Sequence, residues 1–218
     1  MTINYTQARE LMVEQQVRPW DVLDMRVLDV LSTLPREAFV PEIHRALAYT
    51  DIELPLGHGQ RMMKPVVEGR VLQALALQPE EDVLEIGSGS GFLSACLGAL
   101  ARDVLSLEIS PELAASARAN LDAAGLGHNV RIETADVFAW ETERRFDAIC
   151  VTGACAAVPQ AFAKWLRPGG RLFAIHGQSP VMEAVLLHNE VNGSRIESLF
   201  ETDLPYLTGA APAPKFVF

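Results

Sequence analysis

Cysteine is scarce in this sequence, and its arrangement excludes two kinds of site. The 218 residues include three cysteines, Cys96, Cys150 and Cys155, and no two of them form a Cys-x-x-Cys pair. An odd number of cysteines without paired spacing argues against a disulfide framework and against a structural zinc site. Each cysteine lies in an apolar or small-residue stretch, so we expect three buried thiols in a reducing compartment.

Long apolar runs and clustered basic residues are also lacking. No segment reaches the roughly 18 apolar residues that a membrane-spanning helix needs, and the N-terminus has no apolar core of the signal-peptide type. Lysine and arginine total 18 against 28 acidic residues, which gives a net charge of −10. Because a net anion repels phosphate backbones, we expect a cytoplasmic protein with no membrane and no nucleic-acid partner.

Metal-ligand spacings and a recognisable Ser/His/Asp set are absent as well, so we expect no metal site. The composition, 49% hydrophobic and 21% charged, is that of a globular protein, and the length favours one domain. We divide it into a helical cap with an active-site loop (1–64), an α/β core (65–207) and a C-terminal tail (208–218). The apolar end of the tail, 215–218, is expected to pack back on the domain.

The N-terminal part of the chain favours helices. Apolar spacing of three and four residues predicts helices over 5–17, 25–34 and 66–77. Pro19 separates the first two, and Asp21 or Asp24 is the expected N-cap of the second. Residues 36–64 show little periodicity, and an irregular stretch this long in a compact domain is typical of a functional loop.

Strands alternate with helices beyond Pro79. We expect strands over 82–86, 104–108, 130–133, 146–151 and 171–176, and helices over 92–100, 111–123 and 158–166. Two further strands, 181–189 and 194–202, are joined at Asn192-Gly193, a common hairpin turn pair. This alternation predicts an α/β fold: a Rossmann-like doubly wound, mostly parallel sheet with an antiparallel edge hairpin. The N-terminal helical cap is expected to fold over its active face.

A glycine-rich turn follows the first predicted strand. Residues 84–91 read Leu-Glu-Ile-Gly-Ser-Gly-Ser-Gly, and the helix after them offers free N–H groups and the positive end of its dipole. We therefore expect Gly87, Ser88, Gly89 and Gly91 to line a ligand. Since this glycine spacing is a weak signal by itself, the acidic residues around it carry the assignment.

These acids favour S-adenosylmethionine over a dinucleotide. Glu108, followed by Ile109, ends the second strand, where a carboxylate can accept the ribose hydroxyls. Asp136 with Val137 follows the third strand, where it can flank adenine. Glu85 would repel a pyrophosphate but suits the cationic amino-acid head of S-adenosylmethionine. The third glycine of the dehydrogenase fingerprint is also missing from its place.

Several segments resemble the protein-L-isoaspartate O-methyltransferases, and the resemblance extends from residue 13 to about residue 207. The segments are 36–41 (Arg-Glu-Ala-Phe-Val-Pro), 48–51 (Ala-Tyr-Thr-Asp), 54–60 (Leu-Pro-Leu-Gly-His-Gly-Gln), 83–91, 146–152 and 168–171. The resemblance implies methyl transfer from S-adenosylmethionine to the free α-carboxylate of an isoaspartyl residue in a damaged protein or peptide. The methyl ester then collapses to a succinimide, which hydrolyses partly to normal aspartate.

The loop after Gln60 departs from the pattern of this family, which usually reads Thr-Ile-Ser-Gln-Pro. This chain has Arg61-Met62-Met63-Lys64-Pro65, and methionine cannot donate a hydrogen bond. Arg61, Met63 and Lys64 are the loop candidates at the reacting methyl.

Gln60, Arg61, Lys64 and His58 are the expected substrate contacts. In one interpretation the two cations hold an anionic substrate, because an arginine fork grips a carboxylate well. In the other they are solvated charges beside Met62 and Met63, which fill apolar space.

Three functions therefore remain open. The first is isoaspartyl methyl transfer on proteins or peptides, by a monomer or weak dimer. The second is methyl transfer by the same fold to a different small or anionic acceptor. The third is a non-catalytic protein that binds S-adenosylmethionine or a partner, since fold alone does not determine function.

Overall fold

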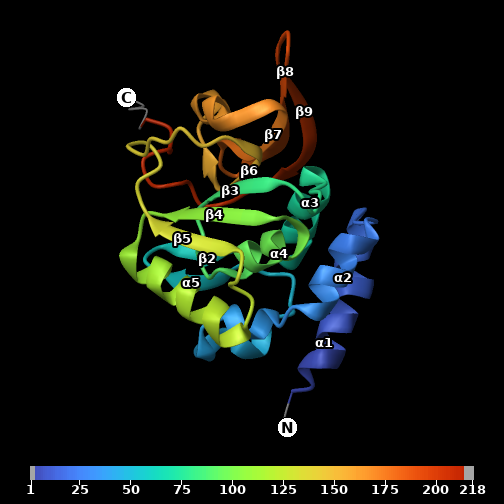
Figure 1. Ribbon diagram of the computed structural model, residues 1–218. Helices are drawn as coiled ribbons and strands as arrows, with labels where there is room; N and C mark the ends of the chain where they lie inside the picture. Colours follow the sequence, from blue (N-terminus) through green and yellow to red (C-terminus); the bar gives the residue numbers. More distant parts are fainter. Residues whose placement is uncertain (1–2, 214–218) are drawn as a thin grey trace, which may run out of the picture.

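A seven-stranded sheet forms the centre of the computed structural model, which describes residues 3–213 (Figure 1). The strand order is β5-β4-β3-β6-β7-β8-β9, with β3 to β7 parallel and β8 and β9 antiparallel. The strands are β3 (Asp82–Ile86), β4 (Asp103–Glu108), β5 (Val130–Thr134), β6 (Phe146–Cys155), β7 (Leu166–Gln178), β8 (Val181–Glu190) and β9 (Gly193–Thr202). The predicted mostly parallel α/β fold with an antiparallel edge hairpin is confirmed.

Three α-helices share one apolar core on one face of the sheet. They are α3 (Pro65–Leu75), α4 (Phe92–Leu100) and α5 (Pro111–Ala124). Alternate strand residues point to opposite faces, so Val83 joins this core while Leu84 joins a second core on the other face. That second core contains the side chains of Phe162 and Trp165.

The α-helix predicted over 158–166 is wrong, because the structure has a short 3₁₀ helix, η5 (Gln160–Trp165). Pro159 and Pro168 bound this segment on both sides. Proline removes a backbone donor and restricts the residue before it. Too few residues remain between them for a stable α-helix, and a 3₁₀ turn suits such short pieces.

The N-terminal helices pack beside the core helices. They are α1 (Tyr5–Met12), continued by a π-helical turn η1 (Val13–Val17) and a 3₁₀ turn η2 (Arg18–Trp20), and α2 (Met25–Thr33). Asp24 is the N-cap of α2, and its carboxylate accepts the Arg26 N–H at 2.9 Å. Because α2 contacts α3 and α4, this part of the cap covers helices and does not fold over the carboxyl edge of the sheet as expected.

The irregular stretch 36–64 contains short elements that lead to the site. Two 3₁₀ turns, η3 (Arg36–Phe39) and η4 (Glu42–Leu47), precede an antiparallel hairpin of β1 (Leu54–Gly57) and β2 (Gln60–Met62). Gly57, His58 and Gly59 at its turn all have positive φ angles. We keep the division into 1–64, 65–207 and 208–218 as a working description.

The edge hairpin of β8 and β9 projects from the sheet (Figure 1). Glu190 pairs with Gly193, so the two-residue turn is Val191–Asn192, one residue before the predicted pair. The segment after β9 returns to the sheet. There the Ala154 N–H donates to the Pro205 carbonyl and the Leu207 N–H donates to the Ala154 carbonyl, each over 2.9 Å. The expected packing of 215–218 lies outside the described residues.

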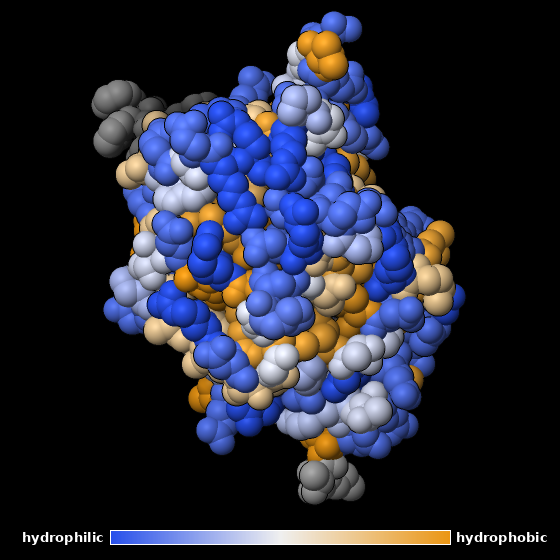
Figure 2. All heavy atoms as spheres, viewed as in Figure 1, coloured by the Kyte–Doolittle hydropathy of each residue, from blue (hydrophilic) through white to orange (hydrophobic). Residues whose placement is uncertain are grey.

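The surface and the buried thiols agree with the composition. Hydrophilic side chains cover much of the face seen in Figure 2, with apolar atoms between them. All three cysteines are buried, and desolvation raises the pKa of each thiol, which makes them poor nucleophiles. Within residues 3–213, no helix combines the length and apolarity needed to cross a membrane, and no cluster of His, Cys, Asp or Glu side chains has the form of a metal site.

Candidate functional site

The glycine-rich turn connects strand β3 to α4 in a conformation that requires glycine. Gly87 has a φ of +99°, and a Cβ there would collide with the Thr152 hydroxyl. Gly91 is the N-cap of α4 with a φ of +85°, and its Cβ would lie 3.1–3.3 Å from Ala117. L-residues with a side chain rarely adopt such angles. Because these positions carry no side chain, the backbone of the turn can approach a ligand bound at the carboxyl end of β3.

A cavity lies beyond the carboxyl ends of β3, β4 and β6. Its position matches the rule that ligands of open α/β sheets bind where the strand order reverses, since β4 and β6 lie on opposite sides of β3. Ten predicted site residues line it: Gln60, Arg61, Met63, Gly87, Ser88, Gly89, Glu108, Ile109, Asp136 and Val137. The hairpin β1–β2 and the segment after β9, with Leu204 and Leu207, complete the lining.

Glu108 is held rigidly at the end of β4. Its Oε2 accepts the Gly89 N–H and its Oε1 accepts the Ser110 N–H, both at 3.0 Å. The residue is 5% exposed and lines the cavity. Because a carboxylate offers about four lone pairs, acceptor capacity remains for two hydroxyls of a ligand.

Ser88 offers the donor that a bound ligand would satisfy. Its hydroxyl is buried, lines the cavity and has no hydrogen-bond partner among residues 3–213. Buried polar groups are rarely left without partners. The glycine turn, this hydroxyl and the Glu108 carboxylate therefore fit an adenosine ligand that carries an amino-acid head.

Four predicted residues do not line the cavity. Glu85 is fully buried and does not line the cavity, and its carboxylate accepts hydrogen bonds from the hydroxyls of Ser94 and Ser106. Gly91 packs against α5. Lys64 is exposed at the N-cap of α3, and His58 is exposed at the hairpin turn.

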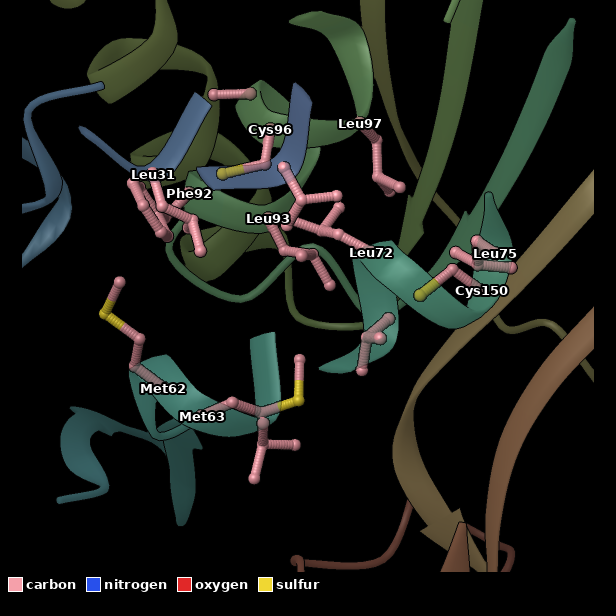
Figure 3. Close-up of a cluster of buried hydrophobic side chains, with 14 of the residues drawn as sticks. Leu31, Met62, Met63, Leu72, Leu75, Phe92, Leu93, Cys96, Leu97 and Cys150 are labelled. Atoms are coloured by element: carbon pink, nitrogen blue, oxygen red, sulfur yellow. The ribbon is translucent and has the colours of Figure 1, made fainter. Parts of the chain in front are cut away.

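The methionines of the altered loop are buried. Met62 is 4% and Met63 7% exposed, and Figure 3 shows them with buried side chains such as Leu72 and Leu93. Arg61, between Gln60 and Met62 on β2, has a side chain that is 52% exposed. The interpretation that the methionines fill apolar space therefore agrees with their burial, while Arg61 is available at the rim.

A buried ion pair that the sequence analysis did not predict is hydrogen-bonded to the backbone of this loop. The Arg36 guanidinium donates to both oxygens of Glu68, at 3.0 and 3.2 Å, and to the carbonyl oxygens of Ala48 and Met63. Arg36 is 0% and Glu68 2% exposed, and Glu68 lines the cavity. Burial raises the pKa of Glu68, which the Arg36 charge opposes. The available signal was a single acid among the apolar residues of α3.

The buried Glu85 should make stability depend on pH. Desolvation raises its pKa to about 7, against the opposing hydrogen bonds from Ser106 and Ser94. The folded state therefore retains a proton that the unfolded state loses near the ordinary value of 4.5. Stability falls as pH rises from about 4.5 to about 7, by roughly 3 kcal/mol.

We expect Glu85→Gln to remove this dependence, because the amide has no proton to lose. Urea unfolding at pH 5 and pH 8 would measure it, with the exposed Glu80→Gln as the matched control. A variant that keeps the native difference in unfolding free energy between the two pH values would contradict the assignment.

Comparison with known proteins agrees with this geometry. Residues 7–200 match the family model described as protein-L-isoaspartate(D-aspartate) O-methyltransferase. Protein-L-isoaspartate O-methyltransferase 2 of Marinobacter nauticus is 38% identical over 200 residues, covering 91% of both chains. Protein-L-isoaspartate O-methyltransferase 1 of Syntrophobacter fumaroxidans is 38% identical over 90% of this chain and 92% of its own.

A solved structure shares the fold. It comes from Plasmodium falciparum, is described as a protein-L-isoaspartate O-methyltransferase in complex with S-adenosyl-L-homocysteine, and superimposes with a TM-score of 0.80 at 20% identity. The match covers 94% of this chain and 99% of that one. The resemblance found in the sequence is confirmed, and the chain belongs to the protein-L-isoaspartate O-methyltransferase family, a family of S-adenosylmethionine-dependent enzymes.

Proposed function

We propose that this protein transfers a methyl group from S-adenosylmethionine to the α-carboxylate of L-isoaspartyl residues in damaged proteins or peptides. One observation carries the proposal: the rigid Glu108 carboxylate and the loop residues Gln60, Arg61 and Met63 line the same cavity. A cofactor bound by Glu108 would therefore lie next to an acceptor bound by the loop residues. The family membership supports the same reaction.

Different residues of the lining would bind different parts of the cofactor. Glu108 would accept the ribose hydroxyls with its remaining lone pairs, and Asp136 with Val137 would flank adenine. Gly87 to Gly89 would hold the methionine part, with the unpartnered Ser88 hydroxyl as a hydrogen-bonding group. The bound cofactor supplies an electrophilic methyl on a sulfonium sulfur.

The acceptor needs little acid or base help, because a carboxylate is already a nucleophile. This chain therefore contributes position and the exclusion of water. Met62 and Met63, at 4% and 7% exposure, and the buried Leu204 form an apolar part of the lining. Such a surface leaves the carboxylate oxygen less hydrated as it lines up behind the methyl carbon.

A second candidate function rests on the altered loop. Met63 stands where the family usually has serine, so no hydroxyl is donated from that position. This favours the alternative of a different small or anionic acceptor, and a non-catalytic cofactor-binding or partner-binding protein remains the third candidate.

The first experiment mixes the protein with methyl-labelled S-adenosylmethionine and an isoaspartyl peptide, with the normal aspartyl peptide as control. We expect base-labile label on the isoaspartyl peptide alone. Equal label on both peptides would favour a less specific acceptor. No label, with S-adenosylhomocysteine binding confirmed by calorimetry, would favour another acceptor or a binding protein.

The compartment, the oligomeric state and the partners of the protein belong to the same proposal. We propose a cytoplasmic monomer or weak dimer that acts on isoaspartyl proteins or peptides and binds no nucleic acid. The net charge of −10 supports the last point, since phosphate backbones repel such a surface. Sedimentation velocity across a tenfold concentration range would measure the oligomeric state.

A further inference from the structure

A second hollow adjoins the cofactor cavity. It has a volume of about 540 Å³ and is lined by the hairpin end, the start of α3 and the end of β9. Apolar residues in its lining are Trp20, Ile52, Val66, Val67 and Phe200. Among residues 3–213, Arg61 is the one side chain that lines both hollows.

Arg61 is also the only cation in the described lining of the cofactor cavity. The acids there are already engaged in part. Glu68 pairs with Arg36, and Glu108 accepts two backbone N–H groups. Asp136 accepts the Phe138 N–H at 2.9 Å. An anionic acceptor entering the cavity therefore meets one positive group.

The Arg61 guanidinium is not committed to another residue by a hydrogen bond in the described chain. Its nearest carboxylate is Glu53, with 3.9 Å between Nε and Oε2, which is too long for a hydrogen bond. The Arg61 side chain is 52% exposed and lines both hollows, so it lies at their common rim. Its planar fork can hold one carboxylate by two parallel bonds and leave lone pairs of that carboxylate for methylation.

The second hollow is poorly suited to a small anion. Besides Arg61, its lining has the cations Lys64 and Arg70, but also four acids: Asp51, Glu53, Glu201 and Asp203. Mixed charge around apolar side chains suits a polypeptide segment, which presents both backbone and varied side chains. The anionic group itself is then best placed at Arg61, where the hollow meets the cofactor cavity.

We propose that Arg61 binds the α-carboxylate of the acceptor residue at this junction and that the second hollow takes the adjoining polypeptide. This rests on the proposed function. Arg61 would thereby replace the neutral donors that the family loop usually supplies, and it would select for a negative charge on the acceptor.

Peptide binding to the protein loaded with S-adenosylhomocysteine tests the proposal without turnover. Two peptides of the same sequence are compared by calorimetry, one with the isoaspartyl α-carboxylate and one with an α-carboxamide in its place. We expect the native protein to bind the carboxylate peptide about 10–100-fold tighter, the range for hydrogen bonds to charged groups. Arg61→Gln should reduce this preference to less than threefold, and Arg61→Lys should retain part of it.

Two control variants separate local from general charge effects. Arg145→Gln removes an exposed arginine in the loop before β6, and should leave the preference intact. Among residues 3–213, this side chain donates to backbone carbonyls alone. Arg131→Gln removes an exposed arginine of β5 that lines neither hollow, so a change below threefold is expected. Affinity for S-adenosylhomocysteine should be equal in all variants.

The outcomes separate this proposal from the proposed function. A carboxylate preference that survives in Arg61→Gln overturns the role of Arg61, even if methyl transfer occurs. A native protein that does not distinguish the two peptides overturns it as well. A preference that depends on Arg61, with no methyl transfer by the native protein, supports the binding role and rejects the proposed reaction. Where transfer occurs, Arg61→Gln should raise KM 10–100-fold and change kcat less than threefold.

Discussion

Arg36→Met is expected to lower the free energy of unfolding by about 3–5 kcal/mol. Arg36 is 0% exposed and donates to Glu68 and to the carbonyls of Ala48 and Met63. Without the guanidinium, the Glu68 carboxylate is left buried without its ionic partner and the two carbonyls lose their donor. Such losses exceed the cost of ordinary surface substitutions.

Urea and thermal unfolding would measure this effect. For a chain of this length, the expected loss corresponds to a fall in Tm of about 6–20 °C. The matched control is the double variant Arg36→Met with Glu68→Leu, which removes both charges. It should recover part of the lost stability, because no unpaired charge stays buried. The recovery should be incomplete, because the carbonyls of Ala48 and Met63 still lack their donor. A loss below 1 kcal/mol in the single variant would show that the pair is not needed.

Glu108→Gln is expected to weaken S-adenosylhomocysteine binding about 100-fold. The carboxylate accepts the N–H groups of Gly89 and Ser110 at 3.0 Å and keeps acceptor capacity toward the cavity. An amide replaces one of its oxygens by an NH₂ group, which would face a backbone donor. The variant therefore loses an acceptor for the ribose and disturbs the glycine turn together.

Calorimetric titration with S-adenosylhomocysteine would measure this loss, with circular dichroism to confirm that the variant is folded. Glu80→Gln should bind like the native protein, because Glu80 is exposed and precedes β3, at the end of that strand away from the glycine turn. A dissociation constant for Glu108→Gln within threefold of the native value would mean that the ribose is held elsewhere.

The glycine turn and the acid at the end of β4 were recognisable in the sequence because their signals are local. Residues 87–91 follow a short apolar strand directly, and Glu108 follows the next one. Once a parallel sheet is inferred, the carboxyl ends of its strands must meet at one edge. The fold class and seven of the lining residues follow from this argument, while Gln60, Arg61 and Met63 were expected from the resemblance to the family.

Other features depend on segments far apart in the chain. The 3₁₀ helix η5 is an exception with a local cause, since Pro159 and Pro168 leave too little length between them for the expected α-helix. Glu85 has the strand position expected from its sequence, but its side chain points to Ser94 and Ser106. Strand alternation places the Glu85 side chain on the face of the sheet covered by α4. Whether this face adjoins the cavity depends on the tertiary structure, which leaves Glu85 outside the lining.

Local patterns in the sequence were enough to predict the α/β architecture and the edge of the sheet where a cofactor would lie, because periodicity and glycine spacing act over a few residues. The family followed from the motifs that the sequence shares with it. Three features became visible in the folded chain: Arg36 pairs with Glu68, Met63 is buried, and Arg61 lines both hollows. Burial and ion pairing depend on contacts between segments tens of residues apart. A buried charge is stable only when the whole fold brings its partner to it.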